Sequence, residues 1–275
     1  MSQVQNLAHA MGVMVIAIPL IAGQSQQQQP SPAPQQQSQQ QQQAQGPKPK
    51  SQQEVEALQK VKTALQSQNS DGAIQAVNDV LENFPNTEYK PVLLNIGMQA
   101  ALQKGDYAQT IIWGDRVIQN NPNDVQARIL LAEDIAQHTR ENDLDKDQSL
   151  HKVDDYANKG LELIKAANNA PEGIPADKWN NYKNQLSGQA YDALGLAADL
   201  RKNFPDAVGK FKSAVDTYPN PVSTAHLAKA YVDNKQYDEA ITTADKVLAM
   251  NEVPPTVKQY AEQQKAAATK LKIAK

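Results

Sequence analysis

Apolar side chains recur at helical spacing along most of this chain, and two stretches near the C-terminal end show the pattern most clearly. In the first, Tyr191, Leu194 and Ala198 fall at i, i+3 and i+7, which places them on one face of a helix. After a short polar break a second such face begins at Phe204, and Pro219 follows it. We therefore expect two packed helices. The apolar face positions of this unit are Tyr191, Leu194, Gly195, Ala198, Phe204, Ala207, Phe211 and Ala214.

The second stretch repeats the pattern one period later. Ala240 lies 33 residues after Ala207, and Pro254 closes this stretch as Pro219 closes the first. A period of this size is typical of helical hairpins that stack and bury their apolar faces on one another. The face positions of the second unit are Thr224, Leu227, Ala228, Tyr231, Tyr237, Ala240, Ala244 and Val247.

Weaker copies of the same spacing lie upstream, and a polar stretch rich in Ala, Gln and Lys at 256–273 has the character of a closing helix. We predict five helical pairs and this closing helix between residue 51 and about residue 273. We also expect Trp113 and Trp179 to serve packing between helices rather than ligand binding. The upstream copies span residues 57–85, 94–122 and 124–164, with turns expected at 69–72 and 104–106 and an insertion at 139–148.

The order of large, small, aromatic, alanine and proline positions from Tyr191 to Pro254 resembles the tetratricopeptide repeat (TPR). The resemblance implies an all-α fold, a right-handed superhelical array of about five helix-turn-helix repeats plus a C-terminal capping helix. In that family the first helix of each pair lines a concave groove, which receives an extended peptide or a partner helix. Carried over to this chain, the partner-binding groove positions are Asn95, Gln99, Gln103, Arg128, Asp192, Asp199, Lys229 and Asp233.

These groove positions are mixed in charge. They lack the convergent Lys/Asn/Arg arrangement by which chaperone-binding members of the family clamp a C-terminal carboxylate, so we do not expect that activity. Each of them could also be an ordinary solvated position on a helix face. The resemblance thus specifies a fold and leaves the identity of a protein or peptide partner open.

Residues 1–47 differ in kind from the rest of the chain, because no charged residue precedes Lys48. Residues 11–22 form an apolar run of the length of the hydrophobic region of a secretory signal, shorter than the ~20 residues of a spanning helix. We expect residues 1–25 to be a signal peptide or, since no Lys or Arg precedes the run, a weak membrane anchor. The protein would then be periplasmic or secreted, and possible membrane tethering would depend on whether the segment is cleaved.

Glutamine and proline dominate the next segment. From Gln24 to Gln45, 14 of 22 residues are glutamine, and proline interrupts them. Such a stretch cannot bury enough apolar surface to offset its conformational entropy, so we expect residues 26–50 to be a disordered, low-complexity linker. It could act as a spacer or have no role. Residues 51–275 are then the repeat domain.

The composition removes several classes of function. The net charge of −3 gives no basic footprint for nucleic acid, and the absence of cysteine excludes disulfides, thiolate metal sites and a cysteine nucleophile. No phosphate-binding glycine loop, GxSxG elbow or HExxH motif is present. We therefore expect no catalytic residues and no cofactor.

One candidate for metal binding lies in the insertion. Alternating aspartates there could place carboxylates on one side of a turn, as calcium-binding loops do. Gln148 stands where such a loop needs glycine, however, and the other interpretation is a solvated loop whose Asp147 or Ser149 caps the next helix. The weak calcium candidate consists of Asp143, Asp145, Asp147 and Asp154.

Three hypotheses for function follow. The first is a non-enzymatic protein–protein interaction scaffold of the bacterial cell envelope, which binds a partner segment in the groove of its repeats. The second is a helical-solenoid accessory protein or enzyme that acts on cell-envelope polymers. The third is a self-assembling structural protein in which the tail or the capping helix joins copies. The oligomeric state is open in all three.

Overall fold

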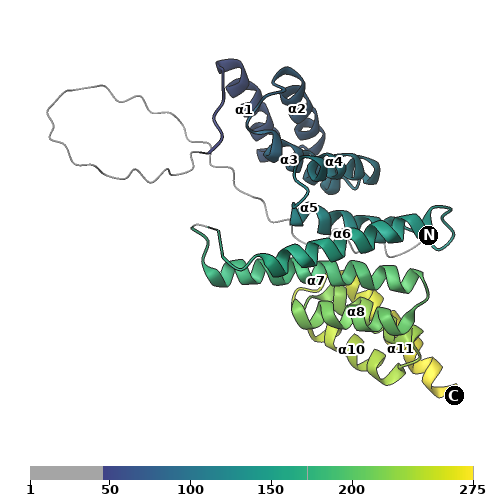
Figure 1. The fold of residues 1–275 in the computed structure, drawn as a ribbon. Helices are drawn as coiled ribbons and strands as arrows, with labels where there is room; N and C mark the ends of the chain where they lie inside the picture. Colours follow the sequence, from purple (N-terminus) through teal and green to yellow (C-terminus); the bar gives the residue numbers. More distant parts are fainter. Residues whose placement is uncertain (1–45, 172, 275) are drawn as a thin grey trace, which may run out of the picture.

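The computed structural model describes residues 46–171 and 173–274, and in this part of the chain turns and loops connect eleven α-helices, with no strand (Figure 1). The signal segment and the glutamine-rich tract expected within residues 1–45 lie outside the described residues. The helices form five successive pairs and a closing helix, so the predicted number and order are confirmed. Their bounds are α1 (Gln52–Gln66), α2 (Ser70–Asn83), α3 (Lys90–Lys104), α4 (Tyr107–Asn120), α5 (Val125–His138), α6 (Lys146–Ala166), α7 (Ala176–Leu200), α8 (Phe204–Thr217), α9 (Pro221–Asp233), α10 (Tyr237–Ala249) and α11 (Pro255–Ile273).

Each helix packs mainly against its neighbours in sequence, as a stacked array requires. The pairs α1–α2 and α3–α4 occupy one end, α8 to α11 occupy the other, and the long helices α6 and α7 lie side by side between them (Figure 1). The helix α7 also contacts α5, so it joins the third pair to the fourth.

Small and large residues interlock within the pairs. The backbone of Gly97 in α3 lies against the indole ring of Trp113 in α4, where a Cβ atom on the glycine would be 2.5 Å from the ring. Gly195 in α7 faces Phe211 in α8 in the same way, with a corresponding distance of 2.6 Å. Both aromatic side chains are buried. The expectation that Trp113 serves packing between helices is confirmed.

Polar side chains fix where several helices begin. The side-chain oxygens of Asn69, Asp124 and Asn220 each accept a hydrogen bond, at 2.9 Å, from the backbone N–H three residues further on. The turn expected at 69–72 was therefore placed too late. Because Asn69 caps α2, Gly72 lies in the first turn of that helix.

The turns inside four of the five pairs share one backbone feature. Gln68, Lys202 and Lys235 adopt left-handed conformations with φ of 52°, 61° and 61°, and Gly105 takes the corresponding place in the second pair with φ of 68°. Left-handed backbone is unfavourable for residues with a Cβ atom. Three of these turns thus use a non-glycine residue where glycine would relieve strain.

The insertion in the third pair is shorter than expected. The helix α6 begins at Lys146, so Asp147 and Ser149 lie inside it and neither caps it. Asp145 stands at the N-cap position but makes no capping hydrogen bond through its side chain. The predicted cap was therefore wrong by two residues or more.

The folded part begins before Ser51. The Tyr89 hydroxyl donates to the Pro47 carbonyl at 2.8 Å, and the Lys50 ammonium donates to the Asn86 carbonyl at 2.6 Å. The buried carboxylate of Glu54 accepts from the Lys50 backbone N–H at 2.6 Å. Residues 47–50, which we assigned to the linker, therefore pack on the α2–α3 connection.

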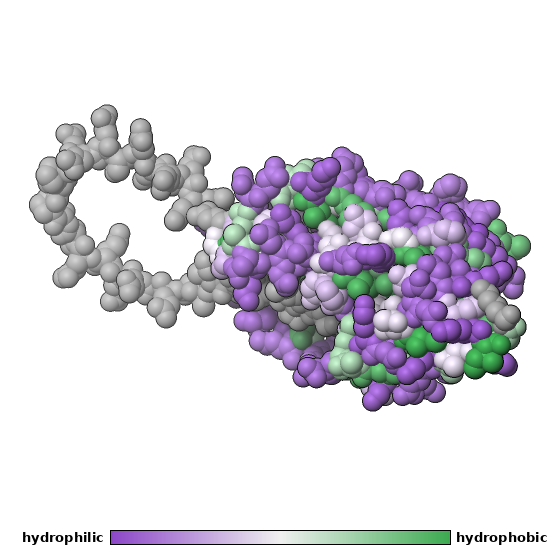
Figure 2. All heavy atoms as spheres, turned by 90° about the horizontal axis from the view of Figure 1, so that it is seen from below, coloured by the Kyte–Doolittle hydropathy of each residue, from purple (hydrophilic) through white to green (hydrophobic). Residues whose placement is uncertain are grey.

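The face seen in Figure 2 is predominantly hydrophilic, with scattered hydrophobic residues. Within residues 46–171 and 173–274, no helix has the combination of length and apolar character needed to cross a bilayer.

Candidate functional site

The first helices of successive pairs meet along a line of polar side chains, which we call the first-helix seam. It runs through α3, α5, α7 and α9, and a contact between side chains joins each helix to the next. The contacts are Asn95 Nδ2 to Asp124 Oδ2 (3.4 Å), Tyr182 Oη to Gln126 Oε1 (3.4 Å), Gln189 Nε2 to Glu133 Oε2 (3.4 Å), His226 Nδ1 to Asp192 Oδ2 (3.0 Å) and Lys229 Nζ to Asp199 Oδ2 (2.8 Å).

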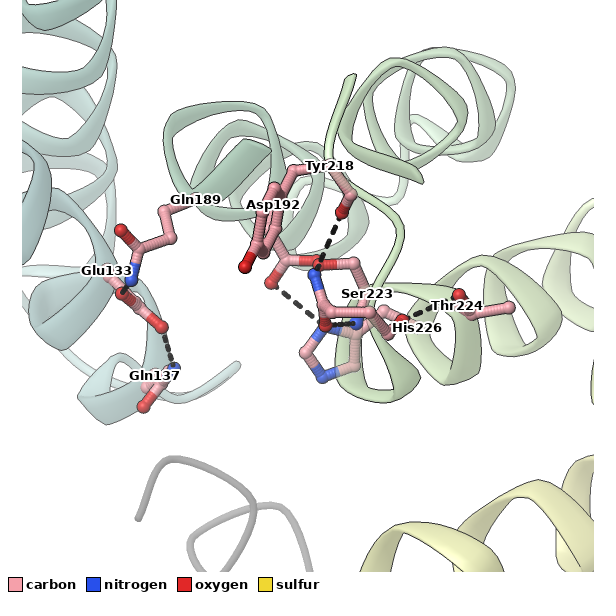
Figure 3. A network of polar contacts seen from close by, with 9 residues as sticks. Glu133, Gln137, Gln189, Asp192, Tyr218, Ser223, Thr224 and His226 are labelled. Atoms are coloured by element: carbon pink, nitrogen blue, oxygen red, sulfur yellow. Dashed lines mark hydrogen bonds and ion pairs between the residues drawn. The ribbon is translucent and has the colours of Figure 1, made fainter. Parts of the chain in front are cut away.

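The most buried contact of the seam joins α7 to α9 (Figure 3). Asp192 is 1% exposed and His226 is 3% exposed, and the ring Nδ1 lies 3.0 and 3.2 Å from the two carboxylate oxygens. Burial lowers the pKa of His226, but the charge of Asp192 and its hydrogen bond outweigh burial, so the pKa is raised above its ordinary value. The ring Nε2 has no hydrogen-bond partner among the described residues. A ring buried in this way can stabilise the negative charge of Asp192, but it is not accessible as a base to a substrate at the surface.

Glu133 occupies the seam between α5 and α7. Gln137 Nε2 donates to its carboxylate at 3.3 Å, and Gln189 reaches it from α7 (Figure 3). Burial, followed by the nearby charges of Asp192 and Asp134, raises its pKa to about 8. Glu133 is therefore mostly protonated at neutral pH.

Lys229 forms the C-terminal end of the seam. Its ammonium lies 2.8 Å from Asp199 on α7 and 2.5 Å from Asp233 on its own helix. Burial lowers the pKa of Lys229, yet these two carboxylates raise it overall. Burial raises the pKa of Asp233, which shares this one cation with Asp199. Lys229 pairs with one oxygen of each carboxylate, and Asp199 Oδ1 has no hydrogen-bond partner among the described residues, so ion pairs close this end of the seam.

The predicted groove residues differ in their position relative to the seam and in their burial. Asn95, Asp199, Lys229 and Asp233 lie in the seam, and Gln99 lies half-buried on the same face of α3 as Asn95. Asp192 also lies there, but its burial means that it cannot contact a partner in this arrangement. The prediction of an accessible groove position was wrong for Asp192.

Two of the predicted groove residues lie away from the seam. Arg128 folds back over the α4–α5 connection, where its guanidinium donates to the Pro122 carbonyl at 2.5 and 2.9 Å and lies 5.9 Å from the Tyr156 ring of α6. The Gln103 amide oxygen lies 3.4 Å from the Ser70 hydroxyl of α2. Neither residue therefore faces the next first helix.

The two tryptophans differ in burial. Trp113 is a core residue, with the Arg116 guanidinium 4.1 Å from its ring centre. Trp179, near the start of α7, is half-buried and lies beside Tyr182, with 5.8 Å between ring centres. The contacts of Trp179 are thus with Tyr182 and Lys183 of its own helix, and the Lys183 ammonium in turn donates to the Ala167 carbonyl of the α6–α7 connection.

The calcium candidate is not assembled. Asp154 forms an ion pair with Arg201 at 2.7 Å, and Asp143 accepts from the Arg140 backbone N–H at 2.6 Å. No group of three or more acidic or histidine side chains in the described part of the chain could hold a metal ion. The alternation of aspartates was misleading because α6 begins within it and separates the carboxylates.

The sequence analysis did not predict a regular relationship between polar side chains and their hydrogen-bond or ion-pair partners. Many polar side chains meet partners one repeat period away, because equivalent positions of adjacent pairs stack on one another. Complementary residues separated by 33 or 34 positions would have revealed them. Such pairs are Glu54–Thr87, Ser70–Gln103, Asp71–Lys104, Asp192–His226 and Asp238–Lys272.

The fold has clear relatives among solved structures, although no sequence-family description and no curated protein matches the chain. The MamA protein superposes with a TM-score of 0.52 at 16% identity, covering 78% of this chain and 93% of that one. A thermophilic TPR protein of Thermus thermophilus gives 0.46 at 18% identity, covering 78% and 99%. Yeast Tom70 gives 0.49 at 15% identity, covering 80% of this chain and 40% of its own. At these identities the likeness concerns the fold alone, and in fold this chain is a TPR-like helical-repeat protein.

Proposed function

We propose that this chain is a non-enzymatic scaffold of the bacterial cell envelope, which binds an extended segment of a partner protein along α3. The observation that carries the proposal is the contrast between the two ends of the seam. At α7 and α9 it is closed by buried and ion-paired side chains. At α3 it is more accessible, since Asn95 is half-buried and Val92 on the same helix face is 36% exposed.

The chemistry of this α3 face suits an extended peptide. Val92, Asn95 and Gln99 fall at i, i+3 and i+7, so they share one face of the helix. Carboxamide side chains can donate to and accept from a peptide backbone, and an apolar side chain beside them gives one contact for a partner side chain. The face carries no charge of its own, which favours recognition of backbone and apolar groups over ion pairing.

The envelope location belongs to the same proposal. It rests on the apolar run at residues 11–22 and on the glutamine-rich segment after it, which would separate the repeats from the export signal. The domain division into residues 1–25, 26–50 and 51–275 follows the same reasoning, and residues 47–50 at the end of the second segment contact the α2–α3 connection.

Affinity capture from the native envelope tests the proposal. Asn95→Ala combined with Gln99→Ala should lose one specific protein partner. The matched control is Gln119→Ala combined with Asn120→Ala, which removes two exposed carboxamides from α4 of the same pair. Capture of the same partners by both double variants would contradict binding along α3.

Self-assembly is a second candidate, because the closing helix ends in exposed apolar side chains. Leu271 is 42% and Ile273 is 81% exposed. Light scattering of the chain from Gly46, compared with a Leu271→Lys/Ile273→Lys variant, decides it. A mass of one chain in both samples would contradict association through α11.

A further inference from the structure

The Asp192–His226 contact lies between two separate apolar clusters. One large cluster extends from Leu58 to Ala197 and includes Ala193 beside Asp192. The other, which we call the C-terminal cluster, holds the last repeat and the closing helix together. Its members are Val222, Ala225, Val247, Val257, Tyr260 and Ala261. A small third cluster around Phe211 also links α7 and α8 to α9.

The packing of α9 on α7 therefore combines a modest apolar contact with a buried polar one. The His226 ring lies 5.4 Å from the Phe211 ring of α8 and 6.5 Å from the Tyr260 ring of α11. Asp192 supplies its hydrogen bond from α7, and Nε2 has no partner among the described residues. The ring is thus held in place by apolar surroundings and by one carboxylate.

Because of the charged groups around this contact, the number of protons on the Asp192–His226 pair determines whether a net charge is buried there. From α5 it faces Glu133, from α7 Asp199, and from its own helix Lys229, while α11 contributes the Tyr260 phenol. Lys229 is the nearby cation, but Asp199 and Asp233 already engage it. Only a protonated His226 ring can then compensate the negative charge of the Asp192 carboxylate.

With that proton the Asp192–His226 pair is neutral, whether the proton resides on nitrogen or on oxygen. Without it, one negative charge remains buried between two helices. A buried unpaired charge is strongly unfavourable, and helices can relieve it by separating and admitting water. Loss of the proton therefore favours separation of α9 from α7.

We propose that the Asp192–His226 contact is a proton-dependent latch, which holds the fifth repeat and α11 against the fourth repeat and releases them when His226 loses a proton. This inference is independent of the proposed partner binding along α3. The direction follows from linkage. Because the folded-state pKa of His226 is raised, its stabilising effect is complete below the ordinary value near 6.5 and disappears as pH rises through the folded value.

Hydrogen exchange of the full chain measures the latch directly. After correction for the intrinsic pH dependence of exchange, protection of α9 and α11 amides should fall by about 5-fold or more between pH 6 and pH 9, while α3 and α4 change by less than about 2-fold. In Asp192→Asn, which keeps a hydrogen-bonding side chain but no charge, the difference between the two regions should vanish. Equal loss of protection in all helices of the native chain would overturn the proposal.

A matched control is available within the same protein. His138 forms a similar pair with Asp134, at 3.1 Å, but both residues lie on α5. The pKa of His138 is raised by its side-chain hydrogen bond to Asp134. His138→Gln should leave the pH response of α9 and α11 unchanged, because its pair does not join two repeats.

A second measurement serves if Asp192→Asn does not fold. NMR titration of the native chain should give a His226 ring pKa above 6.5, and the α9 amide shifts should follow the same midpoint. A His226 pKa at or below 6.5, or α9 amides that do not follow it, would overturn the latch.

Discussion

The contact between Gly97 and Trp113 provides the sharpest test of how the pairs are packed. Gly97→Ala adds one methyl group, whose carbon would lie 2.5, 2.6 and 2.8 Å from three atoms of the indole. The ring has little room to move, because it is 1% exposed and the Arg116 guanidinium lies 4.1 Å from its centre on α4. The methyl group can be accommodated only if α3 and α4 move apart.

The magnitude follows from two opposing effects. Replacing glycine by alanine inside a helix stabilises it by about 1 kcal/mol, whereas overpacking a core costs about 1–3 kcal/mol. Gly97→Ala should therefore destabilise the protein by up to about 2 kcal/mol. Gly209→Ala in α8 is the matched control, since nothing lies within 4 Å of its added methyl group. It should stabilise by about 0.5–1 kcal/mol.

Urea unfolding followed by circular dichroism at helical wavelengths measures both changes. Stability changes should appear as shifts of the midpoint in opposite directions, without a change of slope. A double variant that also carries Trp113→Phe should recover part of the loss caused by Gly97→Ala, because the smaller ring leaves space. If Gly97→Ala stabilises as much as Gly209→Ala, the close approach of α3 and α4 is wrong.

Three further predictions concern other parts of the molecule. Glu133→Gln should lose less stability than the native chain between pH 5 and pH 9 in thermal unfolding. Because the carboxyl pKa is raised from 4.5 to about 8, the folded state binds a proton that alkaline pH removes. The shift corresponds to at most about 5 kcal/mol, which we reduce to about 2 kcal/mol because the Glu133 side chain is only partly buried. Equal pH profiles of the two proteins would refute this prediction. Lys235→Gly should raise stability by about 0.5 kcal/mol because it relieves a left-handed backbone, whereas Lys60→Gly in the middle of α1 should lower it by about 1 kcal/mol; a loss in both would contradict the turn geometry. Calcium at millimolar concentration should leave the unfolding temperature unchanged, and a rise of several degrees would show that the aspartates of the third pair do assemble.

The sequence predicts the number and order of the helical pairs because each pair must bury a periodic apolar face on the next. The same periodicity places Gly97 opposite Trp113 and Gly195 opposite Phe211. These contacts depend on residue size and spacing, which can be read along the chain.

Positions of polar side chains were predicted less well, since they depend on which neighbour satisfies them. Asp192 occupies a groove position by spacing, yet His226 from the next repeat buries it. Arg128 has a carbonyl within reach on its own N-terminal side and folds back to it. In both cases the deciding partner lies outside the local pattern.

Helix boundaries were missed for a related reason. Glycine and aspartate at 69–72 and at 143–147 suggested turns, but capping by Asn69 and the early start of α6 incorporate these residues into helices. A single capping side chain shifts a boundary by one turn without changing the apolar pattern.

Site-specific photo-crosslinking in the native cell tests the central claim most directly. A photoreactive side chain at Gln99 on α3, compared with one at Gln119 on α4, distinguishes the first-helix face from the opposite helix of the same pair. We expect one defined protein adduct at position 99 and none at position 119. The same adducts at both positions, or an adduct at 119 alone, would contradict a partner bound along α3.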